Sequence, residues 1–240
     1  MTPDEWGDAK DPEDMLRFLR GSGRLSDRKA RLFCVAVCRR VWPLMRDERS
    51  RTAVEVAEQF ADELPGGESL AVAAAEARQV KRPDHGPDDA CGEWAAITVR
   101  HAAWLDWFGS KHGYDSAVYT HRTACHAAAS RDVPPYTRAC RKAADAEQAA
   151  QATLVRDIFN PYYTLSLPLK PHNGAIVNLA RAAYDNRTLP EGTLDNARLA
   201  VLGDALEKAG CADGELLGHL RSPGPHVRGC FALYLVLGKA

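Results

Sequence analysis

Apolar residues recur every three or four positions along most of this chain, which is the spacing of one face of an α-helix. Strict alternation of apolar and polar residues, which is typical of strands, is nearly absent. The clearest helical face comprises Ala30, Phe33, Cys34, Val37, Cys38, Val41 and Leu44. The pattern predicts an all-α fold, built as a multi-helix bundle or as stacked helical hairpins.

Capping residues, prolines and glycines predict where the helices begin and end. Ser26 is expected to cap a helix that runs to about residue 45, with Pro43 kinking it or marking its last turn. Ser116 is expected to cap a later helix. Proline suits the first helical position, so the closing helix is expected to begin at Pro225. The other predicted helices cover residues 11–20, 47–64, 68–80, 91–108, 134–158, 174–186, 194–209 and 214–221.

The clearest interruption of this pattern is the segment 160–173, which contains three prolines among alternating apolar residues. Proline cannot continue a helix and biases the residue before it toward extended backbone. We therefore expect one extended, proline-rich crossing between an N-terminal helical region, 1–159, and a C-terminal helical region, 174–240. Both regions are expected to pack into one globular unit.

Composition places the chain among folded globular proteins, with 45% hydrophobic and 26% charged residues and a formal net charge of -1. The near-zero charge argues against a wholesale nucleic-acid binder. The acidic N-terminus lacks a secretory signal, and no apolar run reaches the ~20 residues of a membrane helix. Seven cysteines without a C-x-x-C pair are typical of reduced thiols. These features predict a cytoplasmic protein with no membrane partner.

Charge is nevertheless segregated near the N-terminus. Residues 24–51 carry nine bases and three acids, and residues 52–77 carry six acids and no base. A basic helix could contact nucleic acid or an acidic partner, whereas two adjacent helices of opposite charge could neutralise each other. The second interpretation is the more common one, and exposed charge pairs of this kind contribute little free energy. The candidate basic patch consists of Arg28, Arg31, Arg39, Arg40 and Arg46.

Two histidine–cysteine pairs share the spacing that places side chains one helical turn apart: His121 with Cys125, and His226 with Cys230. His219 lies upstream of the second pair, as does Cys211. A structural zinc site needs four converging ligands, and no cysteine knuckle of the usual kind is present. The sequence therefore favours hydrogen-bonded histidines and predicts no metal and no cofactor. Burial in the apolar run after Cys230 would raise the pKa of its thiol and leave it inert as a nucleophile.

The segment Ser-Pro-Gly-Pro-His-Val-Arg-Gly-Cys, residues 222–230, presents a histidine and an arginine just before an apolar run. If a helix began at Pro225, its unpaired N–H groups would favour an anion beside His226 and Arg228. The favoured interpretation is that the segment anchors the C-terminus and that His226 bonds a backbone carbonyl. Arg228 would then pair with Asp204 or Glu207.

Three stretches carry a resemblance: Asp27–Trp42, Asp47–Glu58, and Ala205–Cys211 together with Gly224–Cys230. On these residues the chain resembles an expanded family of uncharacterised bacterial proteins. The resemblance covers most of the length and implies no activity and no catalytic residues. It suggests a bacterial protein of a kind more typical of interaction or regulatory modules than of metabolic enzymes.

No phosphate-binding loop, dinucleotide fingerprint, zinc-protease motif or nucleophile elbow occurs in the sequence. The leading hypothesis is a non-catalytic helical interaction or regulatory module that binds a protein or another macromolecule. One alternative is nucleic-acid binding through the basic helix. The other is a small-molecule enzyme or sensor with an anion site at His226 and Arg228. The absence of catalytic motifs favours a protein that is not an enzyme.

Overall fold

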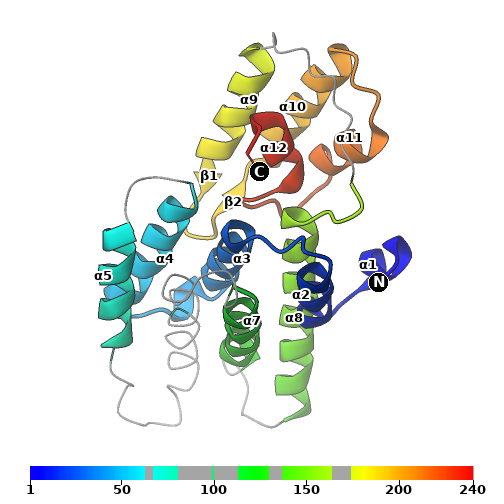
Figure 1. Cartoon of the computed structure of the whole chain (residues 1–240). Coiled ribbons are helices and arrows are strands. Elements are labelled where there is room, and N and C mark those ends of the chain that lie inside the picture. Colours follow the sequence, from blue (N-terminus) through cyan, green and yellow to red (C-terminus); the bar gives the residue numbers. More distant parts are fainter. Residues whose placement is uncertain (63–66, 81–98, 100–112, 130–136, 164–173, 240) are drawn as a thin grey trace. The chain divides into compact units, whose positions relative to one another are not determined.

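A computed structural model describes residues 1–62, 67–80, 99, 113–129, 137–163 and 174–239 (Figure 1). Within these ranges the chain is mainly helical, and its strands form a single two-stranded pair, which confirms the all-α fold. The chain divides into two compact units, Met1–Val155 and Arg156–Ala240. The predicted helix 91–108, except for Val99, lies outside the described residues, as does the part of the proline-rich segment after residue 163.

The first unit is built around a helix that is buried over most of its length, α3 (Asp27–Arg40). Helix α3 packs against α4 and α7. Helix α4 also packs against α5, and α7 also packs against α2. The helices of this unit are α1 (Pro3–Asp8), α2 (Pro12–Gly21), α3, η1 (Trp42–Leu44), α4 (Glu48–Ala61), α5 (Gly67–Arg78), α7 (Gly113–Ala129) and most of α8 (Arg138–Ile158).

Helix boundaries in this unit follow the capping signals in part. The Ser26 side chain accepts a hydrogen bond from the Lys29 N–H, as predicted. The helix ends at Arg40, earlier than expected, and a 3-10 turn follows, because Pro43 has no N–H to continue the α-helical ladder. The prediction that Ser116 caps the next helix is wrong. Helix α7 begins at Gly113, and a capping residue must precede the first helical turn.

The second unit begins with the end of α8 and contains α9 (Gly174–Asp185), β1 (Arg187–Thr188), β2 (Thr193–Leu194), α10 (Asn196–Lys208), α11 (Gly214–Leu220) and α12 (Phe231–Leu237). Helix α10 packs against α9 and α11, and α12 packs against the same two helices. The hydroxyl groups of Tyr184 and Tyr234 lie 3.0 Å apart in the buried α9–α12 contact.

The closing helix begins at Phe231, so the prediction of a start at Pro225 is wrong. The preceding loop uses its backbone groups for a different purpose. Val227 forms an antiparallel bridge with Thr193, and the Leu194 N–H donates to the His226 carbonyl at 2.8 Å. Because these groups are committed to β2, they cannot form a helical turn. The loop 222–230 therefore extends the small sheet and buries the side chains of His226, Val227 and Cys230.

No helix in the described ranges is both long and apolar enough to cross a lipid bilayer.

Candidate metal centre

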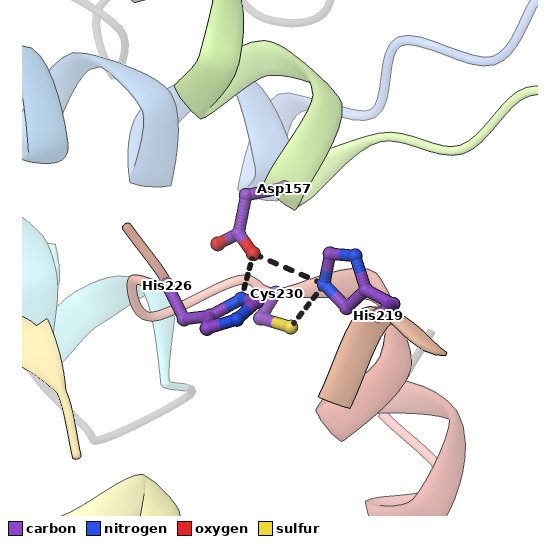
Figure 2. A group of neighbouring side chains, drawn as sticks. All are labelled: Asp157, His219, His226 and Cys230. Atoms are coloured by element: carbon purple, nitrogen blue, oxygen red, sulfur yellow. Dashed lines mark hydrogen bonds and ion pairs between the residues drawn. The ribbon is translucent and has the colours of Figure 1, made fainter. Parts of the chain in front are cut away.

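Four side chains of the second unit converge on one point: Asp157, His219, His226 and Cys230 (Figure 2). One potential ligand atom from each lies within 4.8 Å of every other. The four residues come from three places in the chain, which are the last turn of α8, helix α11, and the loop that leads into α12. This set is the only such cluster of histidine, cysteine and acidic residues in the described part of the chain.

Asp157 contacts both histidines of the group. Its Oδ1 atom lies 2.7 Å from His226 Nδ1 and 3.2 Å from His219 Nε2. Its Oδ2 atom accepts a hydrogen bond of 2.8 Å from the Val227 N–H. The carboxylate is thus fixed through one oxygen and directs the other toward both imidazoles. Such a division suits a carboxylate that binds a metal through a single oxygen.

His226 is oriented by the loop that precedes it. Its Nε2 atom lies 3.1 Å from the Ser222 hydroxyl oxygen and 3.3 Å from the Ser222 carbonyl oxygen. The carbonyl can only accept, so it favours a proton on Nε2. The lone pair of a neutral His226 is then on Nδ1, facing Asp157. Either a proton or a cation must separate that nitrogen from the carboxylate, and a partner on the outer nitrogen is typical of a metal-binding histidine.

His219 and Cys230 complete the group without forming a relay of the catalytic-triad type between Asp157 and the thiol. In a triad the histidine contacts the acid through one ring nitrogen and the nucleophile through the other. Here the Nε2 atom of His219 lies 3.2 Å from Cys230 Sγ and 3.2 Å from Asp157 Oδ1. One nitrogen cannot relay a proton between both groups in that manner. The arrangement instead directs three different donors toward a shared centre.

Because the site is buried, the pKa of each titratable group in it depends on the charges of the others. The side chains of His226 and Asp157 are 1% and 3% exposed, Cys230 is fully buried, and the His219 side chain is 19% exposed. Burial works to raise the pKa of Asp157, but hydrogen bonds from His219 and His226 lower it below its usual value. Burial also works to lower the pKa of His226, yet the hydrogen bond and charge of Asp157 raise it.

Burial, reinforced by the charge of Asp157, raises the pKa of the Cys230 thiol well above its usual range. The thiol is therefore unreactive by itself, as the sequence predicted. A divalent cation changes this balance, because a metal-bound cysteine is deprotonated. With Asp157 and Cys230 both anionic and two neutral imidazoles, a 2+ ion would make the buried centre electrically neutral. This combination of charges fits one divalent transition metal.

The distances fit as well. Four ligands at zinc–nitrogen, zinc–oxygen and zinc–sulfur bond lengths of about 2.0–2.3 Å, placed tetrahedrally, lie about 3.3–3.8 Å apart. The contacts around Asp157 and His219 are slightly shorter than this, and the widest separation in the cluster stays within 4.8 Å. Small side-chain shifts would convert one spacing into the other. No metal was predicted from the sequence, because four converging ligands are not evident there. The structure places four potential ligands together.

The anion candidate pair has a different environment from the one predicted. His226 is directed at Asp157, and the Arg228 guanidinium lies over the Tyr184 ring, 4.9 Å from its centroid. The predicted acids Asp204 and Glu207 bind Arg221 instead, at 2.7 and 2.5 Å. No helix begins beside His226, so the N–H groups that motivated an anion site are absent there.

The five residues of the candidate basic patch do not share one surface. Arg31 and Arg39 are buried, Arg39 pairs with Glu58 at 2.5 Å, and Arg31 lies over the Phe60 ring. Arg28 donates to the Ala61 carbonyl at 2.6 Å and lies 3.7 Å from Asp62. Arg40 binds Glu147 through two hydrogen bonds of 2.8 Å. Arg46 is exposed. The basic and acidic segments thus neutralise each other in part across α3 and α4.

The other histidine–cysteine pair, His121 with Cys125, belongs to no group of metal-ligand side chains in the described residues. His121 Nδ1 lies 2.7 Å from the Gln151 amide oxygen and 3.8 Å from Cys125 Sγ. Gln151 in turn donates to Glu147 at 2.9 Å. Burial lowers the pKa of His121 and raises that of Cys125 to about 12, which keeps both groups neutral. This pair belongs to a buried hydrogen-bond network, as the sequence favoured for its histidines.

The sequence pattern singled out His219, His226 and Cys230 as possible metal ligands but not Asp157. A signal for it exists. Asp157 lies among the apolar residues Leu154, Val155, Ile158 and Phe159 at the end of a helix. The C-terminal end of the helix dipole disfavours a carboxylate, so an acid there needs a specific partner. That argument marks Asp157 as unusual without saying what it binds.

Comparisons with known proteins return no match: neither a protein family, nor a curated protein, nor a solved structure is significantly similar to the chain. The resemblance noted from the sequence stays a prediction, and the site is interpreted from its own geometry.

Proposed function

We propose that this protein binds one divalent transition metal, with zinc as the best fit, through Asp157, His219, His226 and Cys230. The observation that carries the proposal is the convergence of four ligand atoms within 4.8 Å in an interior where three of the side chains are almost fully buried. Buried charged groups are stable only when they are paired or bind metals. A cation at the centre of the cluster would satisfy that requirement for Asp157 and for a Cys230 thiolate together.

The donor set favours zinc over other common metals. Imidazole and thiolate donors suit zinc, whereas magnesium and calcium prefer sites made of oxygen ligands. Four protein ligands in a closed tetrahedral arrangement are typical of structural rather than catalytic zinc. The metal would fasten the end of α8 to α11 and to the start of α12. Its role is therefore to stabilise the second unit.

The metal centre is compatible with the function proposed from the sequence, a non-catalytic helical interaction or regulatory module whose partner is a protein or another macromolecule. His219 contacts Asp157 and Cys230 through the same nitrogen, which supports a role for Cys230 other than that of a nucleophile. All six cysteines in the described ranges carry free thiols, which fits the cytoplasm proposed as its location. Nucleic-acid binding through the basic residues stays an untested prediction.

The test is a titration of the metal-free full-length chain with Co²⁺, a spectroscopic substitute for zinc. We expect one Co²⁺ per chain, intense visible absorption from a four-coordinate site, a thiolate-to-cobalt charge-transfer band, and displacement of the cobalt by Zn²⁺. Asp157→Asn and Cys230→Ser should each lose this tight binding, because each removes an anionic ligand.

Cys125→Ala is the matched control, since it removes a partly exposed thiol from the other histidine–cysteine pair. It should bind Co²⁺ with the same stoichiometry and spectrum as the natural chain. A natural chain that takes up no Co²⁺ or Zn²⁺ would contradict the proposal. So would Co²⁺ binding that depends on Cys125 and not on Cys230.

A further inference from the structure

The four side chains of the cluster are not equally fixed. Asp157 is held by the Val227 N–H, and His226 is held by Ser222. Cys230 is fully buried, and its own N–H donates to the Val227 carbonyl at 3.0 Å. Three ligands are thus positioned by loop 222–230 or by contacts with it. None of these contacts involves His219.

His219 differs from the other three residues in its hydrogen-bond partners and in its exposure to solvent. Its two polar contacts, with Asp157 and with Cys230, use Nε2, and among the residues that the structure describes no hydrogen-bond partner reaches its Nδ1. Its side chain is 19% exposed, whereas those of Asp157 and His226 are at most 3% exposed. Its imidazole is otherwise positioned by ring contacts, with Phe231 at 4.4 Å and edge-on with His226 at 4.7 Å between centroids.

We propose that His219 is the exchangeable ligand of the centre and that a small imidazole or thiol donor from solution can take its coordination position. This inference rests on the proposed metal site. Removal of His219 from the metal would leave Asp157, His226 and Cys230 as three protein ligands. Three protein ligands and one open position are the arrangement of zinc sites that accept an external ligand.

The direction of access follows from the same contacts. A donor from solvent reaches the cluster along the side that His219 partly covers, because the other three side chains are closed off by protein. Metal ions would enter and leave by this side without unfolding of the unit. The chemical class of the external ligand is set by the metal: a compact nitrogen or sulfur donor that can replace an imidazole.

The experiment uses full-length His219→Ala loaded with Co²⁺. This variant should bind the metal more weakly than the natural chain, and added imidazole should shift its visible spectrum and restore tighter binding. His226→Ala is the matched control, because it also removes one imidazole but at a position that is 1% exposed. Imidazole should restore His226→Ala much less than His219→Ala.

Equal recovery of the two variants, or none in a folded, cobalt-loaded His219→Ala, would overturn the inference and leave the metal site intact. Should His219→Ala not fold, transfer of Zn²⁺ from the natural chain to a small chelator decides the question. A rate that rises with chelator concentration supports attack at the exposed ligand, and a rate independent of it refutes this. Failure of the natural chain to bind Co²⁺ at all would instead refute the proposed function.

Discussion

At the scale of single residues, the orientation of His226 depends on its neighbour Ser222. The hydroxyl and carbonyl oxygens of Ser222 both lie within 3.3 Å of Nε2, so that Nδ1 faces the cluster. Outer partners of this kind typically change metal affinity about 10–100-fold when they are removed. We expect Ser222→Ala to lower Co²⁺ affinity by about tenfold, which is the lower end of this range, because the backbone carbonyl of residue 222 still contacts Nε2. Competition with a chromophoric chelator measures the affinity.

Ser222→Thr is the control, since it keeps a hydroxyl at the same position and should retain most of the affinity. An unchanged affinity in Ser222→Ala would show that the carbonyl alone orients the ring. In that case the serine side chain has no role at the metal.

Gly224 determines whether loop 222–230 can place His226 at all. Its φ is +80°, and a Cβ atom at this position would lie 2.8 Å from the His226 backbone nitrogen. Both features disfavour any side chain. We expect Gly224→Ala to destabilise the protein by about 1–3 kcal/mol and to weaken Co²⁺ binding, because the loop must shift to relieve the contact. Urea unfolding and cobalt titration give the two quantities.

Gly218→Ala offers a matched comparison on nearby α11. An added Cβ atom there meets nothing within 4 Å, and the residue is exposed in the helix. Alanine should stabilise that helix by up to about 1 kcal/mol. If both alanine variants changed the stability by the same amount, the strain argument for Gly224 would be wrong.

At the scale of elements, the short helix α11 depends on the residue that caps it. Asp213 accepts hydrogen bonds from the N–H groups of Glu215 and Leu216 and from the Tyr163 hydroxyl at 2.5 Å. The backbone bond from Leu216, followed by the Tyr163 bond, lowers the pKa of Asp213 below its ordinary 3.8. The group therefore stabilises the fold above that pH, and this contribution is lost as the pH falls through the lowered value.

The prediction is that Asp213→Ala costs about 1 kcal/mol at neutral pH, as expected for the loss of a helix cap. In the metal-free chain the difference in stability between the natural protein and Asp213→Asn should shrink as the pH falls below about 4, because asparagine does not titrate. Urea unfolding at several pH values measures it. A difference that stayed constant with pH would mean that the Asp213 charge contributes nothing.

The elements that sequence reasoning located correctly are those specified locally. Ser26, its helix and the boundaries of α4 and α10 follow from capping residues and helical spacing within a few positions. The closing helix was misplaced because Pro225 suits a first helical position equally well in isolation. What decides its conformation is the bridge from Val227 to Thr193, a contact between distant parts of the chain.

The candidate site was predicted only in part for the same reason. His226 and Cys230 were singled out by a helical spacing, yet they lie in a loop and at its junction with α12. Asp157 is 69 residues before His226, so no local pattern connects them. Residue types alone indicated that a metal was conceivable. The convergence of four ligands depends on the packing of α8, α11 and α12, which one sequence does not reveal.

At the scale of the whole molecule, all four ligands belong to the second unit, and the first unit has its own interior. The buried Arg39–Glu58 pair and the bonds of Arg40 to Glu147 hold α3 against its neighbours without any contribution from the metal cluster. Stability in proteins is distributed over such cooperative parts, which open with different free energies. Removal of the metal should therefore act on one part of the chain.

We expect a strong chelator to accelerate amide hydrogen exchange in α11, α12 and the loop 222–230 of the zinc-loaded full-length protein, and to leave α3 and α4 unchanged. The reason is that a metal bound only to the folded state adds its binding free energy to the stability of the part that holds it. Exchange measured by mass spectrometry separates these segments directly. The Asp157→Asn variant provides the control, because chelator should have no effect on a chain that has lost the site. Acceleration that spread equally through α3 and α4 would show that the two units unfold together, and the metal would then stabilise the entire chain.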